Sequence, residues 1–284
     1  MNKKNIIISA CCLFVVLSSA LASDYHSPRT AALGGAGRAG PLLNDSIILN
    51  PSFTSFLPTY AIGGSYGIIN GPPAPGYSQL KGRNWHVSVQ DGRSELFQAG
   101  AAYTQREEGG FLHLGASKSV VQRLGFGLSG KFFFGSQGRK TGKDMTFSMT
   151  FIGGDIFQAA FVIDNIIQSK EMMAIGLRRE YILGIKINIQ GIVLLYLDPH
   201  LTQTLSIHEG FGQEIGGEFI VMKDFFIRAG MLRNATIPWL GQRGRAYGFG
   251  LGWVAPRISL DAGIARAIEP RAATAYVFGA TVYF

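Results

Sequence analysis

The amino-acid sequence predicts an all-β protein: a transmembrane antiparallel β-barrel of about 14 strands with a short N-terminal plug segment. Three observations predict it: an N-terminal export signal, no later apolar run long enough for a membrane-spanning helix, and a period-two alternation of apolar and polar residues from Tyr60 onward. A chain that crosses a membrane without helices must close its sheet, because every backbone polar group in lipid needs a partner within the protein.

Residues 1–22 have the order of a cleaved signal peptide. Residues 1–5 are basic, residues 6–17 are apolar, and residues 18–22 end in small side chains. The apolar stretch is too short for a span, which needs about 20 residues. Ile8-Ser9-Ala10-Cys11 loosely fits a lipoprotein signal, but cleavage there would leave apolar residues 12–17 in water. We therefore expect cleavage after Ala22.

The composition excludes several classes of function. Cleavage after Ala22 removes Cys11 and Cys12, so the mature chain has no disulfide and no cysteine-ligated metal. It also removes Lys3 and Lys4 and lowers the formal net charge from +8 to +6. The remaining basic residues are scattered along an exported chain, so we expect no nucleic-acid partner. No metal-ligand spacing or nucleotide motif is present, so we expect no metal and no cofactor.

The alternation predicts strands with one lipid-like face. In residues 246–254 and 257–264 the aromatic and aliphatic side chains fall on one face, while glycine, serine and charged residues fall on the other. This is the pattern of a transmembrane barrel strand, apolar outward and polar inward. The segments with this pattern are 59–69, 83–90, 95–106, 109–120, 124–135, 143–153, 155–165, 179–189, 191–199, 211–221, 225–233, 244–254, 256–267 and 272–284.

The connections between these segments alternate in length. Counted from the first, the even-numbered ones never exceed about four residues, whereas most odd-numbered ones have about seven or more. Outer-membrane barrels have short periplasmic turns and longer outer loops, which predicts that both chain ends are periplasmic. A water-soluble sandwich also alternates along its strands, but it has no reason to alternate in loop length.

The chain ends with an aromatic residue after an alternating apolar strand. Tyr276, Phe278, Val282 and Phe284 fall on one face, together with Ala280. This resembles the C-terminal signature by which bacterial outer-membrane proteins are recognised for barrel assembly. It implies the barrel-assembly machinery as a partner and the cell outer membrane, with its lipid and lipopolysaccharide, as the surroundings.

Residues 23–58 do not alternate and precede the predicted barrel, residues 59–284. They are rich in small residues and contain an Asn-Pro turn. One interpretation is a periplasmic tail. The other is a plug, since small residues allow backbone to approach a glycine-rich barrel wall.

The segment "RTAALGGAGRAGPLLNDSIILNPS" resembles the N-terminal motif of the FadL/TodX family of outer-membrane transporters for hydrophobic compounds and of its PorV/PorQ-type relatives. Residues 124–131 and 226–230 also resemble strands that recur in that group. The acidic Asp-Asp of the family is reduced here to Asn-Asp, and no ligand-contact motif carries over. The matching residues are Leu33, Gly34, Gly35, Ala36, Asn44, Asp45, Asn50 and Pro51.

The resemblance implies a barrel of about 14 strands closed by its N-terminal segment. It also implies passage of small hydrophobic compounds across the outer membrane. The alternatives are a PorV-like, non-transporting barrel that docks or presents exported proteins, and a structural barrel. Catalysis is not expected, because His113 and Ser117 share a strand face but no nucleophile motif surrounds either residue.

If the bulky face lies outside, a set of polar side chains faces the lumen. We expect most of them to order the plug and to pair with one another rather than to bind a ligand. Ile192, Leu194 and Tyr196 would form an apolar strip among them. The polar candidates are Lys186, Asp198, Glu218, Arg228, Arg257 and Asp261, together with His86, Ser88, His113 and Lys131.

Two expectations concern lumenal contacts. A three-residue turn at residues 222–224 would set Glu218 directly opposite Arg228, with both side chains pointing inward. The Leu33–Ala36 motif should lie against the glycine face formed by Gly248, Gly250 and Gly252, because a lumen of this width needs more than wall side chains to fill it.

Overall fold

The computed structural model describes residues 25–284 except residues 42, 74–78, 137 and 204–206. The predicted signal peptide, residues 1–22, lies outside the described residues.

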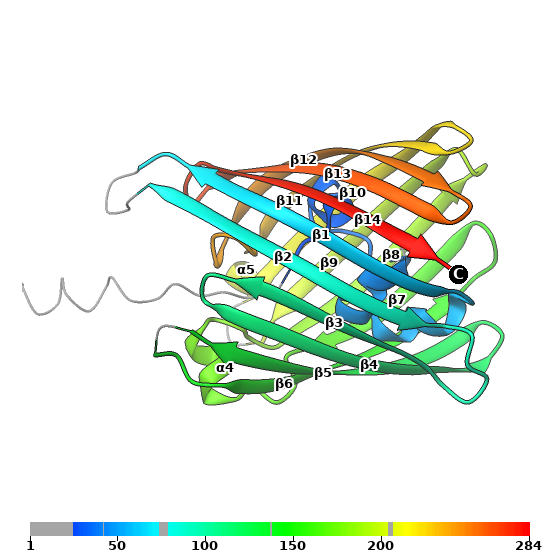
Figure 1. Cartoon of the computed structure of the whole chain (residues 1–284), viewed down its shortest axis with the longest axis horizontal. Coiled ribbons are helices and arrows are strands. Elements are labelled where there is room, and N and C mark those ends of the chain that lie inside the picture. The colour runs from blue at the N-terminus through cyan, green and yellow to red at the C-terminus, as the bar shows by residue number, and fades with distance from the viewer. Residues whose placement is uncertain (1–24, 42, 74–78, 137, 204–206) are drawn as a thin grey trace, which may run out of the picture.

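The described chain forms one closed antiparallel barrel of 14 strands, as the sequence predicts. Each strand pairs with its neighbours in sequence, and the first strand pairs with the last (Figure 1). The strands are β1 (Tyr60–Gly71), β2 (Leu80–Asp91), β3 (Gln98–Arg106), β4 (Gly109–Val121), β5 (Leu124–Gly135), β6 (Gly142–Ile152), β7 (Phe157–Asp164), β8 (Glu180–Ile189), β9 (Val193–Thr202), β10 (Phe211–Met222), β11 (Phe225–Ile237), β12 (Gln242–Ala255), β13 (Ile258–Glu269) and β14 (Ala273–Tyr283).

The seam between β1 and β14 closes the barrel and leaves no free edge. Ala61 lies opposite Tyr283, and the pairing continues in unbroken register to Asn70 and Thr274. In Figure 1 the red β14 runs beside the cyan β1 along its whole length. Closure satisfies the backbone hydrogen bonds of both terminal strands, which a sheet in lipid requires.

The two faces of the barrel wall differ as the alternation predicts. On β12, Tyr247, Phe249 and Leu251 are exposed on the outer face, while Gly248 and Gly250 face the interior. On β6 the inward residues are Thr146, Ser148 and Thr150, all buried. An apolar outer face and a small or polar inner face are what a lipid-embedded barrel needs.

Several connections differ from the sequence-based expectation. The second connection runs over residues 92–97 and is therefore longer than predicted. The connection between β11 and β12 shrinks to residues 238–241, because β11 continues past a β-bulge between Arg233 and Ala235. The sixth connection is a turn over residues 153–156 rather than a single residue. A bulge adds one unpaired residue to a strand, and period-two counting cannot detect it.

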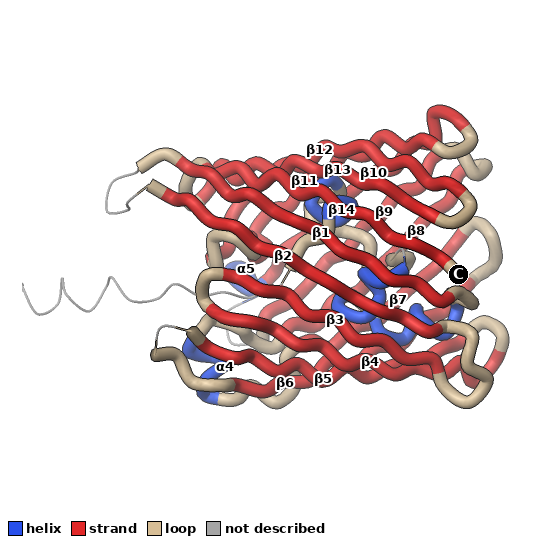
Figure 2. The backbone as a smooth tube through the Cα atoms, viewed as in Figure 1, coloured by secondary structure: helices blue, strands red, loops and turns tan. Residues whose placement is uncertain are grey.

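The N-terminal segment forms short helices inside the barrel (Figure 2). They are α2 (Pro28–Ala32), η1 (Leu43–Asp45), α3 (Ser46–Leu49) and η2 (Pro51–Phe56). Two further helices, α4 (Lys170–Ala174) and α5 (Ile207–Gly210), lie in the connections after β7 and β9. We refer to residues 25–56 as the plug. Among the described residues, no helix is long and apolar enough to cross a membrane.

Candidate functional site: a plugged lumen with one apolar wall

The plug begins with a capped helical turn. The Ser27 hydroxyl accepts a hydrogen bond from the Thr30 amide at 3.1 Å and donates one to Asp45 Oδ2 at 2.6 Å. Pro28 occupies the first turn, where its missing N–H costs nothing. The cap therefore fixes α2 and also ties it to the next piece of the plug.

Glycines of the wall admit the plug backbone at close range. A Cβ atom added at Gly248 would overlap the carbonyl oxygen of Ala31, and one added at Gly230 would overlap the carbonyl group of Leu33. A side chain at Gly250 would meet the methyl group of Ala32 at 2.6 Å. Only glycine at these positions lets the helix lie directly on the sheet.

The Leu33–Ala36 motif does not lie on Gly248, Gly250 and Gly252 as expected. Ala31 and Ala32 occupy the first two of these glycines, and Gly252 instead contacts the Arg228 side chain. The motif lies farther round the wall, with Leu33 on β10 and β11 and Gly35 against Glu214. The glycine face was identified correctly, but the plug motif sits on the adjacent strands.

An ion-pair chain joins the plug to the wall at Arg29. Its Nε lies 3.2 Å from Glu218 Oε2, and its Nη2 donates to the Tyr196 hydroxyl at 2.7 Å. Glu218 also pairs with Arg228, which in turn pairs with Asp261. Arg228 and Glu218 are almost fully buried, so each charge depends on its partner for stabilisation.

A second group of ion pairs and hydrogen bonds holds the plug at Arg38. Its guanidinium pairs with Glu214 and lies 3.3 Å from Asp198 Oδ2. The backbone N–H groups of Gly37 and Arg38 donate to the same Asp198 oxygen at 2.9 Å each. Asp198 and Glu214 of the wall therefore bind the plug at Gly37 and Arg38 through both backbone and side-chain groups.

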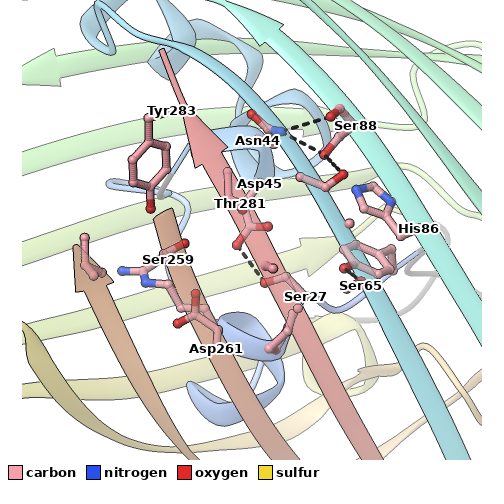
Figure 3. A pocket seen from close by; sticks show the side chains of 18 residues that line it. Ser27, Asn44, Asp45, Ser65, His86, Ser88, Ser259, Asp261, Thr281 and Tyr283 are labelled. Atoms are coloured by element: carbon pink, nitrogen blue, oxygen red, sulfur yellow. Dashed lines mark hydrogen bonds between the residues drawn. The ribbon is translucent and has the colours of Figure 1, made fainter. Parts of the chain in front are cut away.

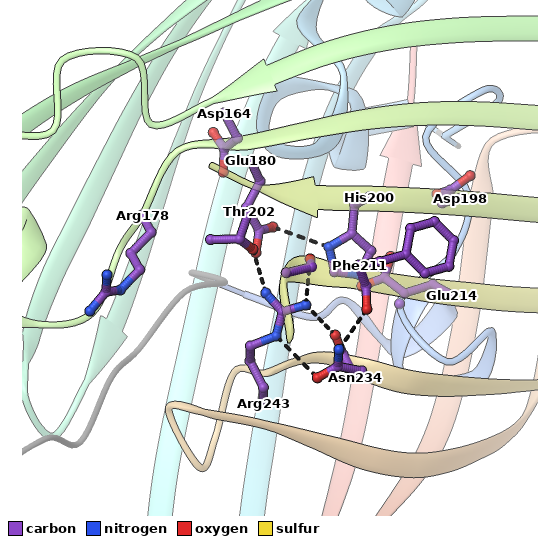
Figure 4. A network of polar contacts seen from close by, with 12 residues as sticks. Asp164, Arg178, Glu180, Asp198, His200, Thr202, Phe211, Glu214, Asn234 and Arg243 are labelled. Atoms are coloured by element: carbon purple, nitrogen blue, oxygen red, sulfur yellow. Dashed lines mark hydrogen bonds and ion pairs between the residues drawn. The ribbon is translucent and has the colours of Figure 1, made fainter. Parts of the chain in front are cut away.

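A polar network lies beside Asp198 and Glu214, the two wall residues that pair with Arg38 (Figure 4). Arg243 donates to the Thr202 hydroxyl and, at 2.9 Å, to the Gly210 carbonyl, and the Thr202 hydroxyl donates to Glu180 at 3.2 Å. His200 Nδ1 lies 3.7 Å from Glu180 Oε2. This network braces β8, β9 and β12 around the connection that carries α5.

The two asparagines of the plug motif, Asn44 and Asn50, anchor the later part of the plug, residues 43–56. Asn50 Nδ2 donates to the Thr150 hydroxyl at 2.8 Å and to the Arg38 carbonyl at 2.7 Å. Asn44 Nδ2 donates to the Ser88 hydroxyl at 3.0 Å. Pro51 begins η2, which lies on β4, β5 and β6. These three motif residues thus contact either the barrel wall or another part of the plug.

Little empty space remains in the described lumen. The best-formed cavity there has about 60 Å³ and lies between the plug and the β1–β14 seam (Figure 3). Asp45, Asp261, Ser65, Thr281 and Tyr283 are among its lining residues. Burial raises the pKa of the Asp45 carboxyl to about 6, against the effect of its hydrogen bond from Ser27 and the charge of Arg29. The cavity is too small for an aromatic solute, and the polar groups among its lining residues can bind water.

One side of the lumen is apolar. The inward side chains of β11–β14 form a buried cluster with α2 and with the connection that joins β11 to β12. Trp239 of that connection packs edge-on against His26, with ring centroids 5.7 Å apart, and Arg106 donates to the Pro238 carbonyl at 2.6 Å. We call this cluster the apolar wall. Its members include Leu232, Ala246, Ala265, Ala267, Ala273, Ala275, Val277, Trp239 and Leu240.

No protein-family model matches the chain, and no curated protein matches its sequence. Several solved structures, in contrast, match its fold. The monoaromatic hydrocarbon channel CymD has a TM-score of 0.69 at 10% identity, over 91% of this chain and 97% of that one. The toluene transporter TodX of Pseudomonas putida has a TM-score of 0.63 at 12% identity, over 94% and 99%. The outer-membrane protein Omp33 of Acinetobacter baumannii has a TM-score of 0.52 at 11% identity, over 80% and 98%.

This chain has the fold of CymD and TodX. The resemblance that residues 29–52 suggested is therefore confirmed at the level of the fold, which is an outer-membrane β-barrel of 14 strands. The first two of these structural relatives are named as a channel and a transporter rather than as enzymes.

Most of the other predicted lumenal residues face inward in this fold. Lys186 lies with its ammonium 5.9 Å from the Tyr196 ring centroid and its stem against Gly40. His86 stacks on Tyr25 at 4.2 Å, and Lys131 pairs with Asp164 at 2.6 Å.

Two lumenal assignments are wrong. Arg257 lies in the turn between β12 and β13 and is exposed, so it does not face the lumen. Ile192 lies in the turn before β9 and is also exposed. Both have the correct strand parity, but the strands end before them. Leu194 and Tyr196 do face inward, and Tyr196 is buried against Leu33.

The residues of the predicted assembly signature lie at the end of the barrel wall. Tyr276, Phe278 and Val282 are exposed on the outer face of β14. Phe284 follows the strand, donates its amide hydrogen to the Tyr60 carbonyl at 2.9 Å and places its ring 5.7 Å from the Tyr60 ring.

Sequence reasoning missed the plug arginines and the tryptophan. Arg29 and Arg38 precede and follow the Leu-Gly-Gly-Ala core, and their spacing from buried carboxylates appears only in three dimensions. Trp239 lies in a segment that the sequence placed in a long outer loop. An aromatic residue after proline in a predicted exposed loop was the available signal.

Proposed function

We propose that the barrel passes small hydrophobic compounds across the outer membrane. The apolar wall carries this proposal. A channel for polar solutes needs hydrogen-bonding groups along its lumen, whereas Ala246, Ala265, Ala273 and Ala275 offer only methyl groups. Two proteins with the same fold, CymD and TodX, are named for aromatic hydrocarbons, which supports the class of solute.

The structure is a closed state for such a solute. A cavity of roughly 150 Å³ is known to hold benzene, but the lumenal cavity beside the plug has only about 60 Å³. Entry therefore requires movement of Trp239, which covers the apolar wall. The buried indole N–H has no hydrogen-bond partner among the described residues, so moving the ring breaks none.

We place the exit at β13 and β14, where the lumenal cavity and a groove on the outer face share lining residues. An apolar groove of about 530 Å³ opens on the outer face over β10–β14, and its floor includes Asp261 and Gly279. The same two residues line the lumenal cavity. Release of the solute sideways into lipid would require both a shift of Pro28 away from Gly279 and local opening of the β13–β14 pairing between Asp261 and Gly279.

Uptake of N-phenylnaphthylamine by intact cells tests the proposal, because this probe fluoresces once it crosses the outer membrane into phospholipid. Trp239→Ala should speed uptake, and Ala275→Asp, which puts a charge on the apolar wall, should slow it. Trp85→Ala on the outer face of β2, away from the lumen and from the outer groove, is the matched control and should change nothing. Heat-modifiable migration on gels verifies that each variant folds.

The opposite result also has a clear meaning. If folded wild-type protein and both lumenal variants give the same uptake as cells without the barrel, the transport proposal is wrong. The densely held plug would then favour the PorV-like or structural barrel.

A further inference from the structure

We propose that three arginines on the outer face of β11, β12 and β13 form a binding site for the phosphate groups of an outer-leaflet glycolipid of the lipopolysaccharide type. The residues are Arg233, Arg245 and Arg266, and we call them the arginine row. The inference does not depend on what the lumen transports.

The register brings the three side chains together. Arg233 lies directly opposite Arg245, and Arg266 lies opposite Tyr247, which is two residues from Arg245 on the same face. Opposite residues on neighbouring strands have Cβ atoms about 5 Å apart, and diagonal neighbours about 7–8 Å. One phosphate-bearing headgroup can therefore span all three.

Like charges at directly opposite positions destabilise a sheet unless a counter-charge is present. The nearest acidic partner is Glu269, whose Oε2 lies 3.9 Å from Arg245 Nε, with both side chains about half exposed. Arg233 and Arg266 have no ion-pair partner among the described residues. The row therefore carries more positive charge than its protein neighbours neutralise.

The row also lies at the height of lipid headgroups. Along the outer face of β12 the side chains are, in order, Trp253, Leu251, Phe249, Tyr247 and Arg245. Trp253 lies at the end of the barrel near the C-terminus, and Arg245 lies toward the opposite end. Tyrosines of transmembrane proteins gather at the level of the headgroups, and arginine is costly only deeper in the hydrocarbon. The sequence Phe, Tyr, Arg marks the passage from acyl chains to phosphate.

A β-bulge fixes this arrangement. The register shift between Arg233 and Ala235 leaves Asn234 unpaired in the ladder, and its side-chain amide donates to the Glu209 carbonyl at 3.0 Å and the Phe211 carbonyl at 2.5 Å. The bulge interrupts the ladder immediately after Arg233, before pairing resumes at Ala235 and Gly244, and Arg233 is the last residue in register before it, opposite Arg245. Bulges often serve to aim a side chain in this way.

The outer leaflet supplies the occupant. The row lies at the end of the barrel opposite the C-terminus and the short turns, which we predict to be extracellular. The lipid of that leaflet carries phosphates on a disaccharide above several acyl chains, and these chains match the exposed Phe249 and Ile264 below the row.

Binding of purified barrel to lipid A in detergent micelles tests the proposal. The triple variant Arg233→Gln, Arg245→Gln, Arg266→Gln should bind about a hundredfold more weakly, since each cation near an anionic lipid surface contributes about 1 kcal/mol. The matched control removes three cations at the same end of the barrel, through Arg139→Gln, Lys140→Gln and Lys170→Gln, and should bind like wild type.

Two further arms complete the test. Dephosphorylated lipid A should bind wild-type protein as weakly as intact lipid A binds the triple variant, and inorganic phosphate at millimolar concentration should not displace lipid A. Equal binding by the triple variant and the control would overturn the proposal, as would equal binding of dephosphorylated lipid. Displacement by free phosphate would show a phosphate site without lipid specificity and would also overturn it.

Discussion

Glu218 on β10 lies directly opposite Arg228 on β11, and the two side chains form an ion pair inside the barrel. The sequence predicted this pair from a three-residue turn, but the turn has two residues, Lys223 and Asp224. A bulge between Ile220 and Met222 supplies the missing residue and keeps both charges on the lumenal face. Without it, one of the two charges would face lipid, at roughly 2–4 kcal/mol near the midplane.

Replacing Glu218 should loosen the plug. Glu218→Gln leaves Arg29 and Arg228 without their shared carboxylate, and breaking a buried ion pair costs about 3–5 kcal/mol. We expect a lower temperature of heat modification on gels and faster trypsin cleavage at Arg38. Glu95→Gln, in the exposed turn between β2 and β3, is the control. An unchanged transition for Glu218→Gln would mean that this pair does not hold the plug.

The sequence predicts the wall of this barrel better than its contents. Alternation in residues 124–135 gives β5 with its correct bounds, because one side of every strand must meet lipid and the other must not. The contacts of the plug depend on which plug residue lies against each glycine of the wall, and the local sequence does not encode that pairing. Gly248 therefore packs against Ala31 rather than against Leu33.

Irregular positions were also beyond sequence reasoning. The bulges at Val221 and Asn234 interrupt no visible pattern, and Arg257 shares the parity of Ser259 and Asp261 although it lies in a turn. Trp239 was placed in an outer loop because the sequence did not show that β11 continues to Ile237.

A methyl group at Gly230 should displace the plug. Gly230→Ala would place its Cβ on the Leu33 carbonyl, where the obstacle is backbone and cannot rotate away. Overpacking of this kind costs roughly 1–3 kcal/mol or more. Gly217→Ala, on the outer face of neighbouring β10, meets only side-chain atoms at 3.5 Å or more and is the matched control. Equal trypsin resistance of the two variants would contradict the close seating of Leu33.

Removing the plug should open a pore. Deletion of residues 25–50 takes away α2, η1 and α3 and leaves an open lumen lined by polar and glycine positions on most sides and by the apolar wall on one. A barrel of about 14 strands is too wide for wall side chains alone to fill. We expect stable, ion-conducting channels in planar bilayers from the deleted protein and near-zero conductance from the intact chain. The same conductance with and without the segment would refute a plugging role.

Cysteine labelling determines which end of the barrel faces the cell exterior. Ser136 lies in the connection between β5 and β6, and Lys223 lies in the turn between β10 and β11 at the opposite end. An impermeant thiol reagent should label Ser136→Cys in whole cells and should label Lys223→Cys only after lysis. The mature chain has no cysteine of its own if cleavage follows Ala22, so the background is low. The reverse pattern would invert the barrel.

The central claim is that the lumen is selective for apolar solutes, and paired uptake measurements in one preparation of cells test it most directly. Cells carrying the intact barrel should take up N-phenylnaphthylamine faster than cells without it, while entry of a polar sugar of similar size should be unchanged. Ala275→Asp should abolish the gain for the apolar probe alone. Faster entry of the sugar, or a gain for the apolar probe that survives Ala275→Asp, would contradict passage along the apolar wall.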